Sequence, residues 1–148
     1  MTEFKLALGV AQKHLKKVDP ELGFIIDHYG DCTIVPHTNY YEELISSIIS
    51  QQLSVKAAST IWQRFIELYD GKTPTPEQII KTDIETIRAV GASYAKARYI
   101  QDLAMHIMSG KLDLAHIATL DNDTLIAQLT SVKGIGEWSA HMFMIFSL

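Results

Sequence analysis

The chain has 148 residues, of which 47% are hydrophobic and 20% charged, and its formal net charge at pH 7 is −4. This size and composition are those of one globular domain, so we expect a single domain over residues 1–148. No apolar run approaches the roughly 18 residues that a membrane helix needs, and we therefore expect no membrane association. The negative charge is unusual for a nucleic-acid-binding protein, although it does not say where the charges lie.

Two features of the sequence bear on its location. The N-terminal segment carries Glu3 and shows no cleavage-like site after an apolar core, so it does not fit a secretory signal peptide. Cys32 is the only cysteine in the sequence, which excludes an intrachain disulfide and a four-cysteine iron–sulfur cluster. A cytoplasmic protein is the expectation.

Hydrophobic residues recur with helical spacing along most of the chain. Helices are predicted over residues 3–17 and 20–29, before a loop at 30–39. A third begins at 40 with an apolar face reaching Leu53, and Ser54 is the expected cap of the next, which reaches Tyr69.

A turn at 70–76 is followed by short helices at 76–81 and 83–90 and by a long helix over 93–109. Further helices are predicted at 112–120 and 121–130, the second capped by Asp121 or Asp123. Little of the sequence alternates with a period of two. We therefore predict an all-α fold, a compact bundle of about eight short helices joined by brief loops.

Residues 131–136, "SVKGIG", separate the last two predicted helices. Glycine adopts positive φ without steric cost, so Gly134 and Gly136 permit a tight reversal, with Ile135 pointing back between the helices. The backbone N–H groups of 134–136 would then point outward at a helix N-terminus, where they suit an anion such as a phosphate. The alternative is a plain turn between two helices.

The wider pattern "L-x-x-V-x-G-I-G-x-W-S-A" resembles the helix-hairpin-helix motif of the DNA glycosylase superfamily, here over residues 124–148, and more narrowly its 3-methyladenine glycosylase branch. "LISSIISQQLSVKAASTIWQRF" (44–65) and "IRAVGASYAKARYIQDLA" (87–104) resemble two other segments of that family, in the same order. Lys133 stands where the family often has Pro. The resemblance covers residues 20–148 and implies phosphate binding by Lys133, Gly134, Ile135 and Gly136.

Such enzymes flip a damaged nucleotide out of the duplex and cut its glycosidic bond. The resemblance implies that a wedge at the Gln-Gln junction, Gln52 with Leu53 beside it, fills the gap left in the base stack. A purely structural role, joining two helices, is the alternative. The implied partner is double-stranded DNA with alkylated bases.

Trp138 and Met142 border the base pocket if the resemblance holds. An aromatic face suits an alkylated purine that carries positive charge, through stacking and cation–π attraction. The alternative for Trp138 is an ordinary core position. Because the bifunctional branch has Lys at the Trp138 position, the resemblance implies a monofunctional enzyme that leaves an abasic site.

No catalytic residue of the family falls within the chain. The aspartate that supports bond cleavage lies some twenty residues beyond the hairpin in the family, past Leu148, and so do the helices that complete the domain. The domain is therefore expected to be incomplete, and its apolar C-terminal helix is expected to pair with another copy or another chain.

No cofactor or catalytic metal is implied. The six histidines show no metal-ligand spacing. The family's hairpin can hold a monovalent cation through its carbonyl groups, here those of Ser131, Gly134 and Gly136.

Three hypotheses follow. The chain belongs to a 3-methyladenine-type DNA N-glycosylase that is active only if the missing aspartate is supplied. It is instead a non-catalytic helix-hairpin-helix protein that holds DNA and cuts nothing. Or it is a helical interaction module, in which case salt-dependent DNA binding is absent.

Overall fold

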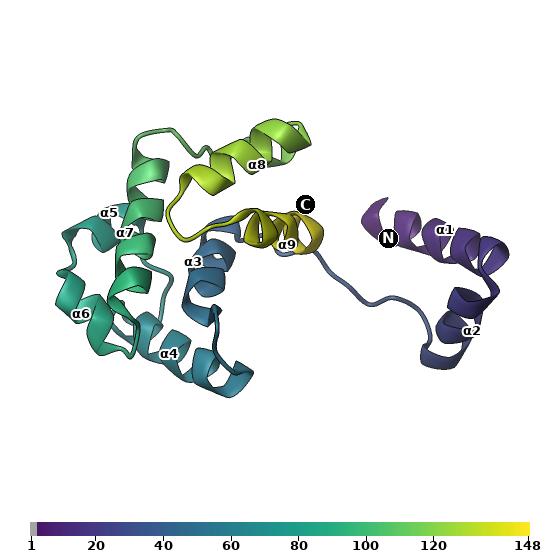
Figure 1. The fold of residues 1–148 in the computed structure, drawn as a ribbon, viewed down its shortest axis with the longest axis horizontal. Helices are drawn as coiled ribbons and strands as arrows, with labels where there is room; N and C mark the ends of the chain where they lie inside the picture. Colours follow the sequence, from purple (N-terminus) through teal and green to yellow (C-terminus); the bar gives the residue numbers. More distant parts are fainter. Residues whose placement is uncertain (1–2) are drawn as a thin grey trace. The chain divides into compact units, whose positions relative to one another are not determined.

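The structure, a computed structural model, describes residues 3–148. The chain forms two compact units, an N-terminal unit that ends at Val35 and a C-terminal unit over Pro36–Leu148. All regular structure in the described residues is helical, with nine α-helices and one 3₁₀-helix, which confirms the predicted all-α class (Figure 1). None of the helices in this part of the chain is long and apolar enough to cross a membrane. A single domain over 1–148 stays a prediction.

The N-terminal unit is a pair of packed helices, α1 (Glu3–Val18) and α2 (Pro20–Tyr29). Asp19 separates them and caps α2, because its carboxylate accepts hydrogen bonds from the N–H groups of the second and third residues of that helix. Gly23 is buried where α2 meets the backbone of α1. The two helices correspond closely to the predicted ranges.

The C-terminal unit holds the other helices: α3 (Tyr40–Ser50), α4 (Val55–Glu67), α5 (Pro76–Lys81), α6 (Ile84–Ala89), α7 (Tyr94–Met108), the 3₁₀-helix η1 (Ile117–Thr119), α8 (Asn122–Ser131) and α9 (Glu137–Ser147). Each of α3 to α8 begins at a side-chain cap, provided in turn by Asn39, Ser54, Thr75, Asp83, Ser93 and Asp121. These caps satisfy backbone N–H groups that have no partner within the helix.

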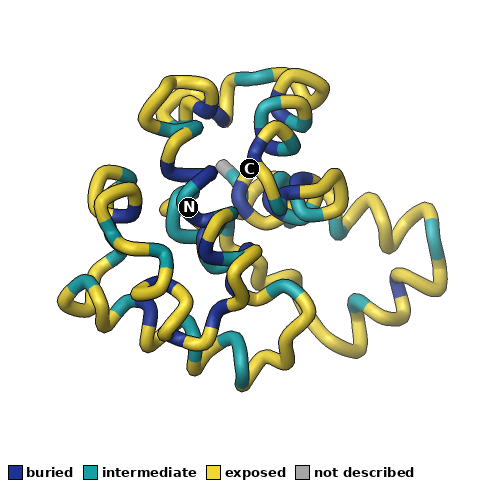
Figure 2. The backbone as a smooth tube through the Cα atoms, turned by 60° about the vertical axis from the view of Figure 1, so that its left-hand side comes forward, coloured by how far each residue is buried: buried dark blue, intermediate teal, exposed yellow. Residues whose placement is uncertain are grey.

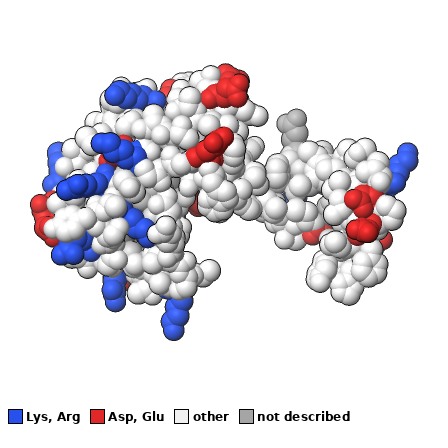
Figure 3. Space-filling model, in the orientation of Figure 1, with Lys and Arg blue, Asp and Glu red and all other residues white. Residues whose placement is uncertain are grey.

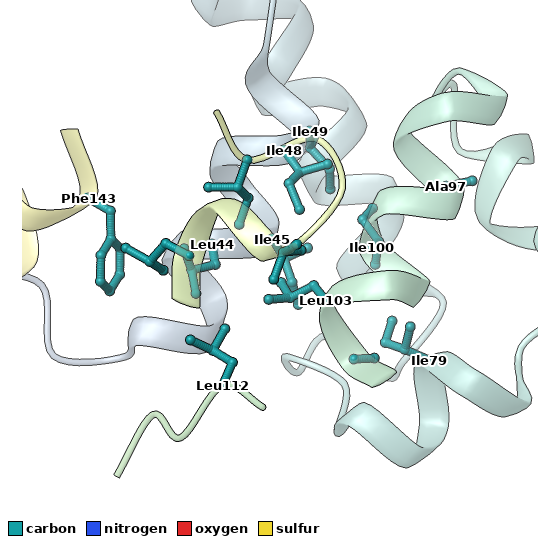
Figure 4. Packing of buried hydrophobic residues seen from close by; sticks show 14 of the residues in the cluster. Leu44, Ile45, Ile48, Ile49, Ile79, Ala97, Ile100, Leu103, Leu112 and Phe143 are labelled. Carbon is teal, nitrogen blue, oxygen red and sulfur yellow. The ribbon is translucent and has the colours of Figure 1, made fainter. Parts of the chain in front are cut away.

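The core of this unit is centred on α3. Its apolar face packs against Ile100 and Leu103 of α7 and against Phe143 of α9 (Figure 4). The face consists of Leu44, Ile45, Ile48 and Ile49, none more than 1% exposed. Figure 2 shows the buried positions gathered where the helices of this unit face one another. The core thereby fixes α7 and α9 on either side of α3.

Two predicted helices differ from the structure. Residues 112–120 form only η1, because the Asp113 carboxylate accepts the N–H of Ala115 and makes a local turn that competes with a helix. The helix beginning at Tyr40 ends at Ser50, so Leu53 lies in the following turn rather than on its apolar face. Of the two candidate caps of α8, the structure selects Asp121.

Candidate functional site

The glycine segment forms a tight hairpin between α8 and α9, as predicted. Gly134 has φ +87°, and Ile135 donates its N–H to the Val132 carbonyl at 3.1 Å. The Ile135 side chain is 5% exposed and belongs to the core cluster, so it pins the reversal to the core. One detail of the prediction is wrong: the N–H of Ile135 is used within the turn and does not point outward as a free donor.

Glycine is required at position 134 for two reasons. Its left-handed backbone disfavours any side chain, and a Cβ atom there would lie 2.1 Å from the ring of Tyr99 on α7. Gly136 differs, because its φ of −88° suits any residue and a Cβ atom there would meet nothing within 4 Å. The first glycine therefore builds the turn, while the second leaves open space at the start of α9.

The start of α9 has free backbone donors. Its N-cap is Gly136, and no side chain caps the helix, in contrast to α2 to α8. The hydrogen bonds of the described residues also leave the N–H groups of Gly134 and Gly136 without a backbone acceptor. An uncapped helix N-terminus with free N–H groups is suited to a phosphate.

The Gln-Gln turn contacts the hairpin directly. The Gln51 side-chain amide donates to the Gly134 carbonyl at 2.7 Å. The Lys96 ammonium of α7 donates to the carbonyls of Ile49 and Gln51 at 2.8 and 2.7 Å, and partial burial lowers its pKa. Segments more than eighty residues apart in sequence thus meet at one place.

The two predicted wedge residues lie in the same turn. Gln52 is exposed and adopts φ +57°, an uncommon conformation for a residue other than Gly. Leu53 is also exposed. The turn held by Gln51 and Lys96 therefore presents Gln52 and Leu53 to the outside beside the hairpin, and the wedge role itself stays a prediction.

Trp138 and Met142 line one pocket of about 310 Å³ between α3 and α9. Trp138 is 74% exposed, so it is not a core residue. The other residues of the lining are His37, Glu43, Ser46, Ser47, Ser50, Phe143, Phe146 and Ser147. The structure thus brings together the two residues predicted for the base pocket and opens them to solvent.

The polar residues of the pocket were not predicted from the sequence. His37 Nδ1 lies 3.1 Å from a Glu43 carboxylate oxygen, and the backbone N–H of His37 donates to the Phe146 carbonyl at 2.9 Å. Glu43, Ser46, Ser47 and Ser50 repeat with helical spacing on α3 opposite its buried face. That stripe was a usable signal, but most such stripes are simply solvated. Among the described residues that line the pocket, Glu43 is the one carboxylate.

Two predicted cation ligands already accept hydrogen bonds. The Gly134 carbonyl accepts from Gln51, and the Gly136 carbonyl accepts the N–H of Ala140 at 2.9 Å. A carbonyl has a second lone pair, so the cation site stays a prediction. No group of three or more His, Cys, Asp or Glu residues within 3–148 is arranged to hold a metal ion.

Charge is distributed unevenly over the C-terminal unit. Figure 3 shows most of its Lys and Arg side chains on the side where α4 to α7 lie, and acidic side chains in the region of α8. Lys133 of the hairpin has a largely exposed side chain. A net negative charge therefore coexists with a locally cationic surface.

The sequence matches, over residues 45–140, the family described as HhH-GPD superfamily base excision DNA repair protein. It is 37% identical to DNA-3-methyladenine glycosylase 1 of Schizosaccharomyces pombe, over 99% of this chain and 66% of that protein. It is 34% identical to the DNA-3-methyladenine glycosylase of Saccharomyces cerevisiae, over 95% of this chain and 52% of that protein. The chain thus spans about half to two thirds of these relatives.

Solved structures of 3-methyladenine glycosylases share the fold of this chain. The crystal structure of a DNA-3-methyladenine glycosidase from Bacillus halodurans superimposes with a TM-score of 0.80 at 38% identity, over 90% of this chain and 61% of that one. The S. pombe 3-methyladenine DNA glycosylase in complex with abasic DNA gives 0.80 at 37% identity, over 93% and 69%. The hairpin, the Gln-Gln turn and the helical core lie within the matched region, and the chain belongs to the HhH-GPD superfamily of base excision DNA repair proteins.

Proposed function

We propose that this chain holds duplex DNA for a base-excision N-glycosylase of the 3-methyladenine type, a monofunctional enzyme that hydrolyses the bond to an alkylated base. One observation carries the proposal: the uncapped start of α9 adjoins both the exposed Gln52 turn and the Trp138 pocket. The hairpin would hold a phosphate, the turn would enter the base stack, and the pocket would take the flipped base.

The pocket supports a cationic, alkylated base as the substrate. Its exposed Trp138 offers an aromatic face, and the Glu43 carboxylate adds a negative charge to the same lining. Both attract a positively charged purine more than a neutral one. Trp in place of the Lys of bifunctional relatives supports hydrolysis without strand cleavage.

The direct test is binding to a duplex with a tetrahydrofuran abasic analogue, compared with an intact duplex of the same sequence. The analogue duplex should bind about tenfold more tightly, because no base there has to be unpaired and unstacked. Equal affinity for the two duplexes would contradict the proposal.

A second candidate is a DNA-binding role without catalysis. It is favoured by one observation: within the described residues, the pocket's carboxylate, Glu43, is already paired with His37. Chromatography of methylated duplex DNA after incubation with the chain tests this second candidate. Release of 3-methyladenine would contradict it.

The exposed residues of α9 support a further proposal, that this helix pairs with another copy of the chain. Ile145 and Phe146 of α9, and Leu148 directly after it, are all exposed large hydrophobic residues. Light scattering after size exclusion tests it. A mass that stays at 16.6 kDa at high concentration would contradict self-association.

A further inference from the structure

Asp102 is a buried residue of α7 whose carboxylate contacts the hairpin. The residue is 7% exposed, and its Oδ2 atom accepts the backbone N–H of Lys133 at 2.9 Å, across 31 positions of sequence. Lys133 immediately precedes Gly134, so this hydrogen bond acts where the chain begins to reverse.

The surroundings of Asp102 show which contact matters. Its other neighbours are the Lys133 ammonium at 3.9 Å, on a mostly exposed side chain, and His106 Nδ1 at 3.4 Å. A buried carboxylate is costly unless hydrogen-bonded, and a charged acceptor makes a stronger bond than a neutral one. The short, well-defined contact is the one to the Lys133 N–H.

A second contact from the same helix fixes the other side of the turn. The ring of Tyr99 lies directly against Gly134, and Tyr99 and Asp102 are three residues apart on one face of α7. Together they set both the position and the orientation of the hairpin on α7. Neither contact involves the N–H groups of Gly134 and Gly136.

We propose that Asp102 is a positioning residue for DNA binding: its carboxylate holds the Lys133 N–H and thereby aims the hairpin at a phosphate. The inference rests on the proposed phosphate-binding function of the hairpin. The charge of Asp102 by itself opposes binding, because it would repel a phosphate held by the hairpin and partly offsets the charge of Lys133. Its benefit must therefore come from the hydrogen bond that it accepts.

The test compares Asp102→Ala with Asp102→Asn by fluorescence anisotropy on a tetrahydrofuran-containing duplex. Alanine removes the acceptor and should weaken binding about tenfold, the usual effect of losing one hydrogen bond to a charged group. Asparagine keeps an oxygen acceptor and removes the charge, so it should bind at least as tightly as the unmodified chain. Equal losses in both variants would overturn the inference, because the carboxylate charge would then be the important feature.

Controls separate positioning from stability and from net charge. Asp123→Ala removes one exposed negative charge from α8 and should leave binding unchanged or slightly tighter. If Asp102→Ala does not fold, Asp102→Leu keeps the branched shape of the side chain without an acceptor and should show the same loss. Binding by this folded variant equal to the unmodified chain would overturn the inference alone. Absence of salt-dependent binding by the unmodified chain would instead contradict the proposed function.

Discussion

At the scale of single residues, Gly134 and Gly136 of the hairpin have different structural roles. Gly134 needs a left-handed backbone and lies against Tyr99, whereas Gly136 has an ordinary backbone and faces open space. The left-handed backbone and the contact with Tyr99 explain why glycine stands at position 134. Gly136 is explained by what must approach the start of α9, so the two positions should respond differently to substitution.

Substitution Gly136→Asp should strongly weaken DNA binding without unfolding the chain. The new carboxylate would occupy the space of a phosphate and repel it, at a cost of about 2 kcal/mol or roughly 30-fold in Kd. Gly136→Ala is the matched control and should keep most of the binding. Anisotropy titrations compare the three proteins. Unchanged binding by the Asp variant would contradict a role for the hairpin in DNA binding.

Substitution Gly134→Ala should act on stability. The left-handed backbone and the overlap with Tyr99 together should lower the free energy of unfolding by roughly 3 kcal/mol. Urea unfolding followed by circular dichroism measures this. A loss no larger than that of Gly136→Ala would contradict the assigned geometry.

At the scale of elements, the turn between α3 and α4 combines a fixed base with an exposed tip. Gln51 and Lys96 hold the base through backbone carbonyls, and Gln52 forms the tip with positive φ. The sequence placed the Gln pair at a helix junction but could not divide the roles, since adjacent identical residues carry the same local signal. Only the fold shows that Gln51 points to the hairpin.

Substitution Gln52→Gly should remove the wedge side chain while leaving the turn itself intact. Relief of the left-handed backbone offsets the greater freedom of unfolded glycine, so stability should change by less than about 1 kcal/mol. The preference for the abasic duplex should fall. Asp70→Gly is the control, because Asp70 has a similar φ of 56° in another turn; an equal effect on binding in both variants would contradict the wedge role.

The cap of α8 should make stability depend on pH. Hydrogen bonds from the Thr124 backbone N–H and hydroxyl lower the pKa of the Asp121 carboxyl below its ordinary value of 3.8. A lowered folded-state pKa stabilises the protein above pH 3.8, and this contribution disappears as the pH falls through the lowered value. The difference in Tm between the unmodified chain and Asp121→Ala should therefore shrink from pH 6 to pH 2.5; a constant difference would contradict this cap.

At the scale of the whole molecule, the helical class and the hairpin could be predicted because both depend on local pattern. Periodic apolar residues gave α3, α4 and α7, and the caps Ser54 and Ser93 marked helix starts. The prediction erred at 112–120, where Asp113 makes a local turn. Contacts between distant segments could not be predicted, above all those from Asp102, Tyr99 and Gln51 to the hairpin, because each depends on how helices pack.

The hairpin, the Gln52 turn and the Trp138 pocket are proposed to form a single surface for damaged duplex DNA. The most direct measurement is the affinity of the unmodified chain for the abasic-analogue duplex as salt is varied. We expect tighter binding than to intact duplex and a slope of log K against log salt of about −2 to −4, from a few phosphate contacts. Binding that ignores both the abasic site and the salt concentration would contradict this proposal.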